Sequence, residues 1–128
     1  MSRRNALLAA STALALLSIT APGSHGAELV MFERAGCVWC ARFDAEIAPI
    51  YPKTEASRTA PLRRIDLGRP LPADLAGIDP GAFTPTFVVV DKGREIGRIR
   101  GYPGEDFFFG FLERILTATD VPAGPVTN

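Results

Sequence analysis

The order of apolar and polar residues predicts short strands alternating with helices. A mostly apolar run at residues 28–33 is typical of a buried central strand. A helical pattern follows it from about Cys37 and should end near Ala48, because Pro49 and Pro52 cannot continue a helix. Within that pattern apolar residues recur at spacings of four and three: Phe43, Ile47 and Ile50.

The middle of the chain is less regular. Residues 53–60 are polar, and we expect a turn there. Residues 61–67 predict a second strand with imperfect alternation, from the apolar positions Leu62, Ile65 and Leu67. Residues 68–83 are rich in proline and glycine, so they predict a loop with one short helix around residues 73–76.

The C-terminal third predicts a hairpin and a closing helix. Residues 86–91 are β-branched and apolar, Lys92-Gly93 forms a tight turn, and residues 95–100 form the antiparallel return strand. Gly101-Tyr102-Pro103 breaks the chain before the last helix, since proline suits a first helical turn. Five residues of that helix form one apolar face, for which we expect core packing, with a partner groove as the alternative: Phe107, Phe108, Phe111, Leu112 and Ile115.

The resulting order is β-α-β-(short α)-β-β-α. A parallel βαβ unit followed by a hairpin and a covering helix predicts an α/β fold: a mixed four-stranded sheet with helices on both faces.

The N-terminus predicts export. Arg3 and Arg4 precede the uncharged run 6–20, and a turn-prone segment of small residues follows that run. This is the layout of a secretory signal peptide, which we place at residues 1–26 to within about three residues. An uncleaved anchor is the alternative, although the apolar run is shorter than the ~20 residues that span a bilayer. The paired arginines also raise a twin-arginine export route.

Cleavage would leave one domain, residues 27–119, and a flexible tail, residues 120–128. Without Arg3 and Arg4 the chain has 12 basic and 14 acidic residues and no basic patch. This charge balance gives no indication of binding to nucleic acid or to an anionic membrane. We also expect the protein to be a monomer.

The candidate chemistry lies in the only two cysteines, Cys37 and Cys40, at the junction of a strand and a helix. Cys37 sits at the helix N-terminus, where unpaired N–H groups and the helix dipole favour a thiolate, so we interpret it as the nucleophile. Cys40 is one turn further on and is interpreted as the resolving thiol.

Three other interpretations of the cysteine pair remain open. A structural disulfide closing so short a loop would stabilise the fold weakly. A zinc site would need two more strong ligands, and the only histidine, His25, would leave with the signal peptide. Two buried thiols without redox function are the third, against which Gly36 and the helix start favour exposure.

A Cys-x-x-Cys that opens the first helix of a βαβ unit resembles the thioredoxin superfamily. The resemblance implies that Pro85, just before the strand at residues 86–91, is a cis-proline beside the cysteines. Thr84 would then pair through its backbone with an extended partner peptide. An ordinary trans turn proline is the alternative. Trp39 is either a contact for the partner or for glutathione, or a solvent-tolerant rim residue.

Longer motifs indicate a narrower group. They resemble the periplasmic thioredoxins of the bacterial sulfur-oxidation (Sox) system, and they are Gly36-Cys37-x-Trp39-Cys40-Ala41-Arg42, Glu46-Ile47-x-Pro49, Tyr51-Pro52-Lys53-Thr54, Ala60-Pro61-Leu62-Arg63-Arg64-x-Asp66, Thr84-Pro85-Thr86-Phe87 and Gly101-Tyr102-Pro103-Gly104-Glu105-Asp106-Phe107-Phe108. The resemblance implies a periplasmic thiol-disulfide oxidoreductase with a minimal thioredoxin fold. Its partners would be the SoxYZ sulfur carrier and, as electron donor, a membrane thiol transporter. It implies no metal, flavin or nucleotide cofactor beyond the Cys37–Cys40 disulfide.

The chain also departs from ordinary thioredoxins. Val38-Trp39 replaces the Gly-Pro between the cysteines, and Gly36 replaces the preceding tryptophan. Met31 stands where thioredoxins have a buried aspartate, and the minimal core is glutaredoxin-like. Two alternative functions therefore remain: a glutathione-linked reductase that needs only Cys37, and a binding or regulatory module switched by the disulfide.

Overall fold

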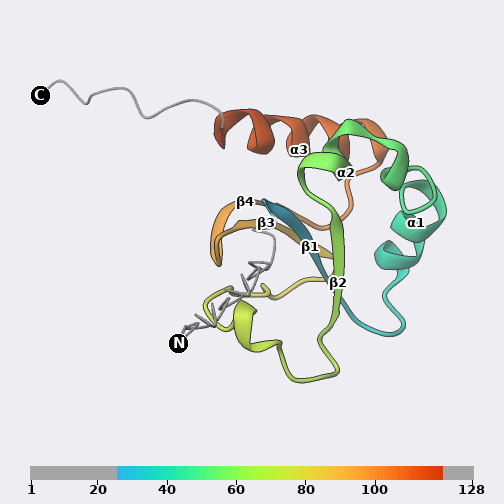
Figure 1. The fold of residues 1–128 in the computed structure, drawn as a ribbon. Helices are drawn as coiled ribbons and strands as arrows, with labels where there is room; N and C mark the ends of the chain where they lie inside the picture. The colour runs from blue at the N-terminus through green and yellow to red at the C-terminus, as the bar shows by residue number, and fades with distance from the viewer. Residues whose placement is uncertain (1–25, 120–128) are drawn as a thin grey trace, which may run out of the picture.

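The computed structural model describes residues 26–119 (Figure 1). The elements in chain order are β1 (Glu28–Glu33), α1 (Val38–Glu46), the 3-10 helix η1 (Tyr51–Lys53), α2 (Glu55–Thr59), β2 (Leu62–Asp66), the 3-10 helix η2 (Ala73–Leu75), β3 (Thr86–Asp91), β4 (Arg94–Arg100) and α3 (Glu105–Thr119). Apart from Gly26, the predicted signal peptide and the predicted tail lie outside the described residues. Between residues 26 and 119, no helix has the length and apolar character that crossing a membrane requires.

The four strands form one mixed sheet in the order β2-β1-β3-β4. β1 pairs in parallel with β2 and antiparallel with β3, and β3 pairs antiparallel with β4. The central strands carry the most apolar sequences, and residues 29–32 of β1 are completely buried. The predicted α/β fold with a mixed four-stranded sheet is therefore confirmed.

Each face of the sheet has its own core. On one face α1 and α3 cover the sheet, and Phe43, Phe87 and Phe108 pack ring against ring with centroids 4.8–5.4 Å apart. The loop between β2 and β3, with η2, lies on the other face (Figure 1). It packs there through Leu75 and Ile78. Phe43 lies one turn after Cys40 on α1, so the aromatic core holds the helix that carries the cysteines.

The turn predicted at residues 53–60 is wrong, because helix α2 forms there. The Thr54 hydroxyl accepts a hydrogen bond from the N–H of Ser57 at 3.2 Å and donates one to the carbonyl of Tyr51 at 2.7 Å. Glu55 adds a negative charge in the first helical turn. Capping stabilises this single polar turn, which is too short to produce an apolar period.

The apolar face predicted for the last helix is wrong in part. Phe107 is 66% exposed and Phe111 is 38% exposed, whereas the buried residues of α3 are Phe108, Leu112 and Leu116. Each residue advances about 100° around a helix, so Phe107 and Phe111 lie to one side of the face that meets the sheet. Their rings instead pack against each other at a centroid distance of 6.4 Å.

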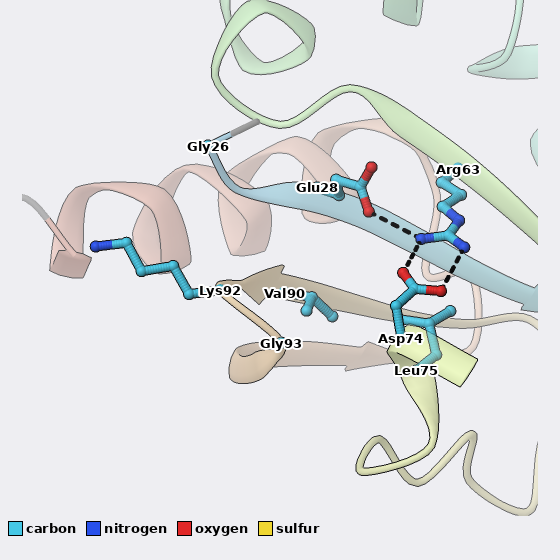
Figure 2. A pocket seen from close by; sticks show the side chains of 8 residues that line it. All are labelled: Gly26, Glu28, Arg63, Asp74, Leu75, Val90, Lys92 and Gly93. Carbon is cyan, nitrogen blue, oxygen red and sulfur yellow. Dashed lines mark hydrogen bonds and ion pairs between the residues drawn. The ribbon is translucent and has the colours of Figure 1, made fainter. Parts of the chain in front are cut away.

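A cluster of ion pairs lies at the start of β1 (Figure 2). The cysteines follow the other end of that strand. Arg63 of β2 pairs with Glu28 at 3.3 Å and donates two hydrogen bonds to Asp74, at 2.5 and 3.1 Å. These groups line an open hollow of about 360 Å³ together with Lys92. The charges of Arg63 and its two carboxylate partners are satisfied within the cluster, and no cysteine lies there.

Candidate active site

Cys37 and Cys40 are joined by a disulfide at the start of α1, with their Cα atoms 5.2 Å apart. Cys37 is the N-cap of α1, and its Sγ accepts a hydrogen bond from the backbone N–H of Cys40 at 3.1 Å. Gly36, at φ +76°, takes the left-handed conformation that the chain needs between β1 and α1. The strand-to-helix junction predicted for the cysteine pair is confirmed.

The two sulfurs differ in access. Cys37 is half-buried, whereas Cys40 is 4% exposed and packs in the core. Val38 and Trp39, between them, are exposed, Trp39 to 51%. A partner that approaches from solvent therefore meets Cys37 first, inside an apolar rim.

The Thr84–Pro85 peptide bond is cis, as the thioredoxin resemblance implied. Thr86 pairs with Phe32 across antiparallel strands. Residues 84–85, which lead into β3, therefore lie at the same end of the sheet as the segment that leads from β1 to Cys37. Pro85 is buried, and its carbonyl accepts a hydrogen bond from Gly101 at 2.8 Å. Within residues 26–119, no group forms a hydrogen bond with the backbone N–H or C=O of Thr84. These groups are free for an incoming chain.

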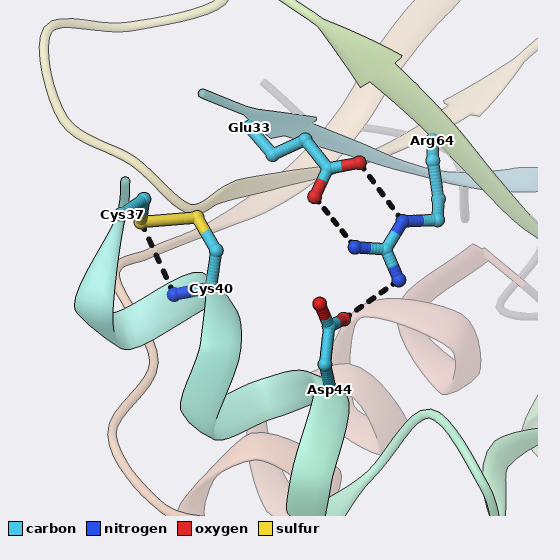
Figure 3. Close-up of polar contacts among 5 residues, drawn as sticks. All are labelled: Glu33, Cys37, Cys40, Asp44 and Arg64. Carbon is cyan, nitrogen blue, oxygen red and sulfur yellow. Dashed lines mark hydrogen bonds and ion pairs between the residues drawn. A yellow bond between two sulfur atoms is a disulfide. The ribbon is translucent and has the colours of Figure 1, made fainter. Parts of the chain in front are cut away.

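Arg64 of β2 ties α1 to the sheet beside the disulfide (Figure 3). It donates two hydrogen bonds to Glu33 at the end of β1, at 2.9 and 2.5 Å, and one to Asp44 of α1 at 2.7 Å. The hydrogen bonds with Glu33 and then Asp44 raise the pKa of the Arg64 guanidinium. No local pattern indicated this three-residue contact, although Arg64 belongs to one of the motifs of the resemblance.

A second polar chain runs from the exposed Trp39 to the core. The Arg42 guanidinium lies 5.8 Å from the Trp39 ring centroid and donates to Glu46 at 2.7 Å. The Tyr102 hydroxyl donates to the other Glu46 oxygen at 2.5 Å, and the two hydrogen bonds hold the pKa of Glu46 below its usual value. Burial, and then the contact with Glu46, raises the pKa of Tyr102. The spacing of Arg42 and Glu46 was a visible signal for an ion pair, but the contact with Tyr102 was not.

The arrangement supports reversible dithiol–disulfide chemistry. The accessible cysteine, Cys37, is at a helix N-terminus and is bonded to the buried cysteine, Cys40. The backbone of Thr84, which has no hydrogen-bond partner among residues 26–119, lies at the same end of the sheet. Among the residues that the structure describes, no cluster of three or more histidine, cysteine and carboxylate side chains has an arrangement that could hold a metal ion.

Comparison with solved structures finds a periplasmic thioredoxin, SoxS from Paracoccus pantotrophus in its reduced form. It is 49% identical, with a TM-score of 0.67, over 73% of this chain and 98% of its own. Thioredoxins of Malassezia sympodialis and Fasciola hepatica share the fold at 16% and 18% identity, with TM-scores of 0.59 and 0.55. They match 73% and 71% of this chain and 80% and 82% of their own. No protein-family model matches the chain, and no curated protein matches it in a sequence search.

Proposed function

The chain belongs to the family of the periplasmic thioredoxin SoxS, and we propose that it is an exported reductase that keeps a cysteine of a periplasmic sulfur-carrier protein in its thiol form. The chain is a thiol-disulfide oxidoreductase with a Cys-x-x-Cys disulfide in a thioredoxin fold. The observation that carries the proposal is the asymmetry of that disulfide. Its accessible sulfur is at a helix N-terminus and its buried sulfur is one turn inward.

In the proposed reaction Cys37 and Cys40 start as the dithiol. The Cys37 thiolate attacks a sulfur of the partner's disulfide, so a mixed disulfide forms and the partner's second sulfur leaves as a thiolate. The Cys40 thiolate then attacks the Cys37 sulfur and releases the partner's cysteine. Two electrons pass to the partner, and the enzyme is left as the Cys37–Cys40 disulfide. The N–H of Cys40 and the helix dipole stabilise the Cys37 thiolate in the first step.

We assign partner binding to Thr84, Pro85 and Trp39. An extended partner segment pairs with the free backbone N–H and C=O of Thr84, as in a short β-augmentation. Two observations support the other two assignments: the bond before Pro85 is cis, and the indole of Trp39, two residues after Cys37, is exposed.

The family supports a periplasmic setting for this chain. We propose that residues 1–26 direct export and are removed, and that the domain of residues 27–119 works in the periplasm, where its named relative works. The partner would be the SoxYZ carrier protein, and a membrane thiol transporter would return the enzyme to the dithiol form.

A trapping experiment tests the proposal. The Cys40→Ser variant, expressed with its own export signal in the cell of origin, should accumulate the mixed disulfide on Cys37, which mass spectrometry identifies. The Cys37→Ser, Cys40→Ser double variant is the matched control and should trap nothing. One dominant sulfur-carrier protein supports a dedicated reductase, whereas a broad set of exported proteins would contradict it in favour of a general oxidase or isomerase.

Two further outcomes would replace the proposed function. Glutathione alone on Cys37, with turnover retained in Cys40→Ser, would indicate a glutaredoxin-like reductase. Partner binding that survives loss of both cysteines would indicate a redox-responsive binding module.

A further inference from the structure

An open hollow of about 280 Å³ lies next to the cis-proline segment. It is lined by residues of the loop before β3 and of the two last strands: Asp79, Gly81, Ala82, Phe83, Thr86, Arg98 and Arg100. Thr86 begins β3 and pairs with Arg100, the last residue of β4. The hollow is therefore at the end of the sheet where β1 leads to Cys37. Phe83, which directly precedes Thr84, is 71% exposed.

Of the charged side chains that line the hollow, Arg100 is the one with an unused guanidinium. Arg98 pairs with Glu95 and donates to the carbonyl of Asp79 at 3.0 Å. The Asp79 carboxylate accepts a hydrogen bond from Gly81 at 2.9 Å. Arg100 is exposed, and within residues 26–119 its side chain has no ion pair or hydrogen bond. A free guanidinium binds a carboxylate through two parallel hydrogen bonds.

The backbone of Arg100 is also open to an incoming strand. Gly101 donates to the carbonyl of Pro85, which makes these two residues a hydrogen-bonded pair of the antiparallel ladder. Such pairs alternate with pairs that are not hydrogen-bonded, so the N–H and C=O of Arg100 point away from β3. β4 is the last strand of the sheet, and no described strand pairs with that side.

A second hollow continues the surface around this open edge. It measures about 340 Å³, shares Arg98 and Arg100 with the first, and is bordered by Pro103 and the exposed ring of Phe111. The edge therefore presents strand-pairing groups and a free cation between two exposed aromatic rings, Phe83 and Phe111. This combination fits an extended, acidic peptide with apolar residues beside the acidic one.

We propose that Arg100 selects the protein partner by binding an acidic side chain close to the reactive cysteine of an extended partner segment, with Phe83 packing beside it. The inference rests on the proposed function as a reductase of a protein cysteine. Arginine on an edge strand also discourages strand-to-strand association between copies. The experiment has to separate the two roles.

The test uses the reduced full chain and short peptides whose single cysteine carries a chromogenic thionitrobenzoate in mixed disulfide. The peptides are identical except for glutamate, glutamine or lysine on both sides of the cysteine. The second-order rate of chromophore release should be about 1.5- to five-fold higher for the glutamate peptide than for the glutamine peptide, the range expected for one exposed ion pair. The lysine peptide should react slowest.

Two charge reversals isolate Arg100. Arg100→Glu keeps a charge on the edge strand, so it still discourages association between copies of the chain. It should nevertheless reverse the order of the peptide rates and make the lysine peptide react fastest. Arg94→Glu is the matched control, since Arg94 is an exposed arginine at the opposite end of β4, and it should keep the wild-type order. A small uncharged disulfide should react equally with all three proteins.

Wild-type rates that do not depend on peptide charge, with the small disulfide still reduced, would overturn this inference and leave the proposed function standing. Reversal by Arg94→Glu as well as by Arg100→Glu would overturn it too, because the effect would then belong to overall charge. A concentration-dependent wild-type dimer that Arg100→Glu abolishes would mean that the edge serves a second copy of this chain. Failure to reduce any disulfide would remove the proposed function itself.

Discussion

Replacing Tyr51 by phenylalanine removes one hydroxyl from the connection between α1 and β2. That hydroxyl donates to the carbonyl of Ala60 at 2.6 Å, and neither residue has any exposed surface. The bond joins η1 to the residue two positions before β2, so it closes the loop behind the helix that carries the cysteines. The aromatic ring and its apolar burial would stay unchanged.

The cost follows from the carbonyl that is left behind. Without the hydroxyl the Ala60 carbonyl is buried and unpaired, which costs about 1–3 kcal/mol of unfolding free energy. A domain of this size has about 5–15 kcal/mol in total. Tyr51→Phe should therefore lower stability by about 2 kcal/mol and the melting temperature by about 8–16 °C, at roughly 4–8 °C per kcal/mol.

The substitution should also change how stability depends on pH. Burial raises the pKa of Tyr51 above its usual value of about 10. The stabilisation from keeping this tyrosine neutral is complete below about pH 10 and is lost as the pH rises through the folded-state pKa. Tyr51→Phe should lose less stability than the wild type above pH 10. Some loss should remain, because the pKa of Tyr102 is raised as well.

Urea unfolding followed by circular dichroism, at neutral pH and at about pH 10.5, measures both effects on the oxidised protein. Tyr102→Phe is the control, because its hydroxyl contacts a Glu46 carboxylate that water still reaches. It should destabilise less than Tyr51→Phe at neutral pH. A neutral-pH loss for Tyr51→Phe below about 0.5 kcal/mol, or an unchanged alkaline slope, would refute the reasoning.

Three further predictions concern packing and access. Gly97→Ala should lower the free energy of unfolding by about 1–3 kcal/mol, because an added Cβ would lie 2.7 Å from the Ile115 side chain. In an Ile115→Ala background the same substitution should lower it little, and equal losses in both backgrounds would contradict the clash. Trp39→Ala should change stability by less than about 0.5 kcal/mol, because the indole is half exposed, while slowing turnover of the protein partner; unchanged turnover would remove Trp39 from the binding site. After reduction, iodoacetamide should label Cys37 well before Cys40 in peptide mass spectra, and equal labelling would contradict the difference in burial.

Local patterns carried much of the fold. The strand at residues 28–33 and the strand at residues 86–91 were predicted at their observed bounds, since each is a dense apolar run ended by polar residues. The short helix around residues 73–76 is the 3-10 helix η2. Helix α2 was missed because its signal is one cap, Thr54 to Ser57, without an apolar period.

The candidate site divides in the same way. The cysteine pair was visible because both sulfurs lie within one helical turn, and the cis bond before Pro85 was implied by the family resemblance. The contacts that hold α1 were not visible. Arg64 meets Glu33 across 31 residues of sequence, and Tyr102 meets Glu46 across 56.

By itself, the sequence determined the kind of chemistry, the strand–helix junction that carries it and the class of fold, because each depends on neighbours within a few residues. The tertiary structure alone decided that Cys37 is accessible while Cys40 is buried, that Phe107 and Phe111 face solvent, and that Arg100 stands unpaired beside the cis-proline. Burial and pairing depend on strand register and on which elements pack together. Those are properties of the assembled sheet and helices, and no single segment encodes them.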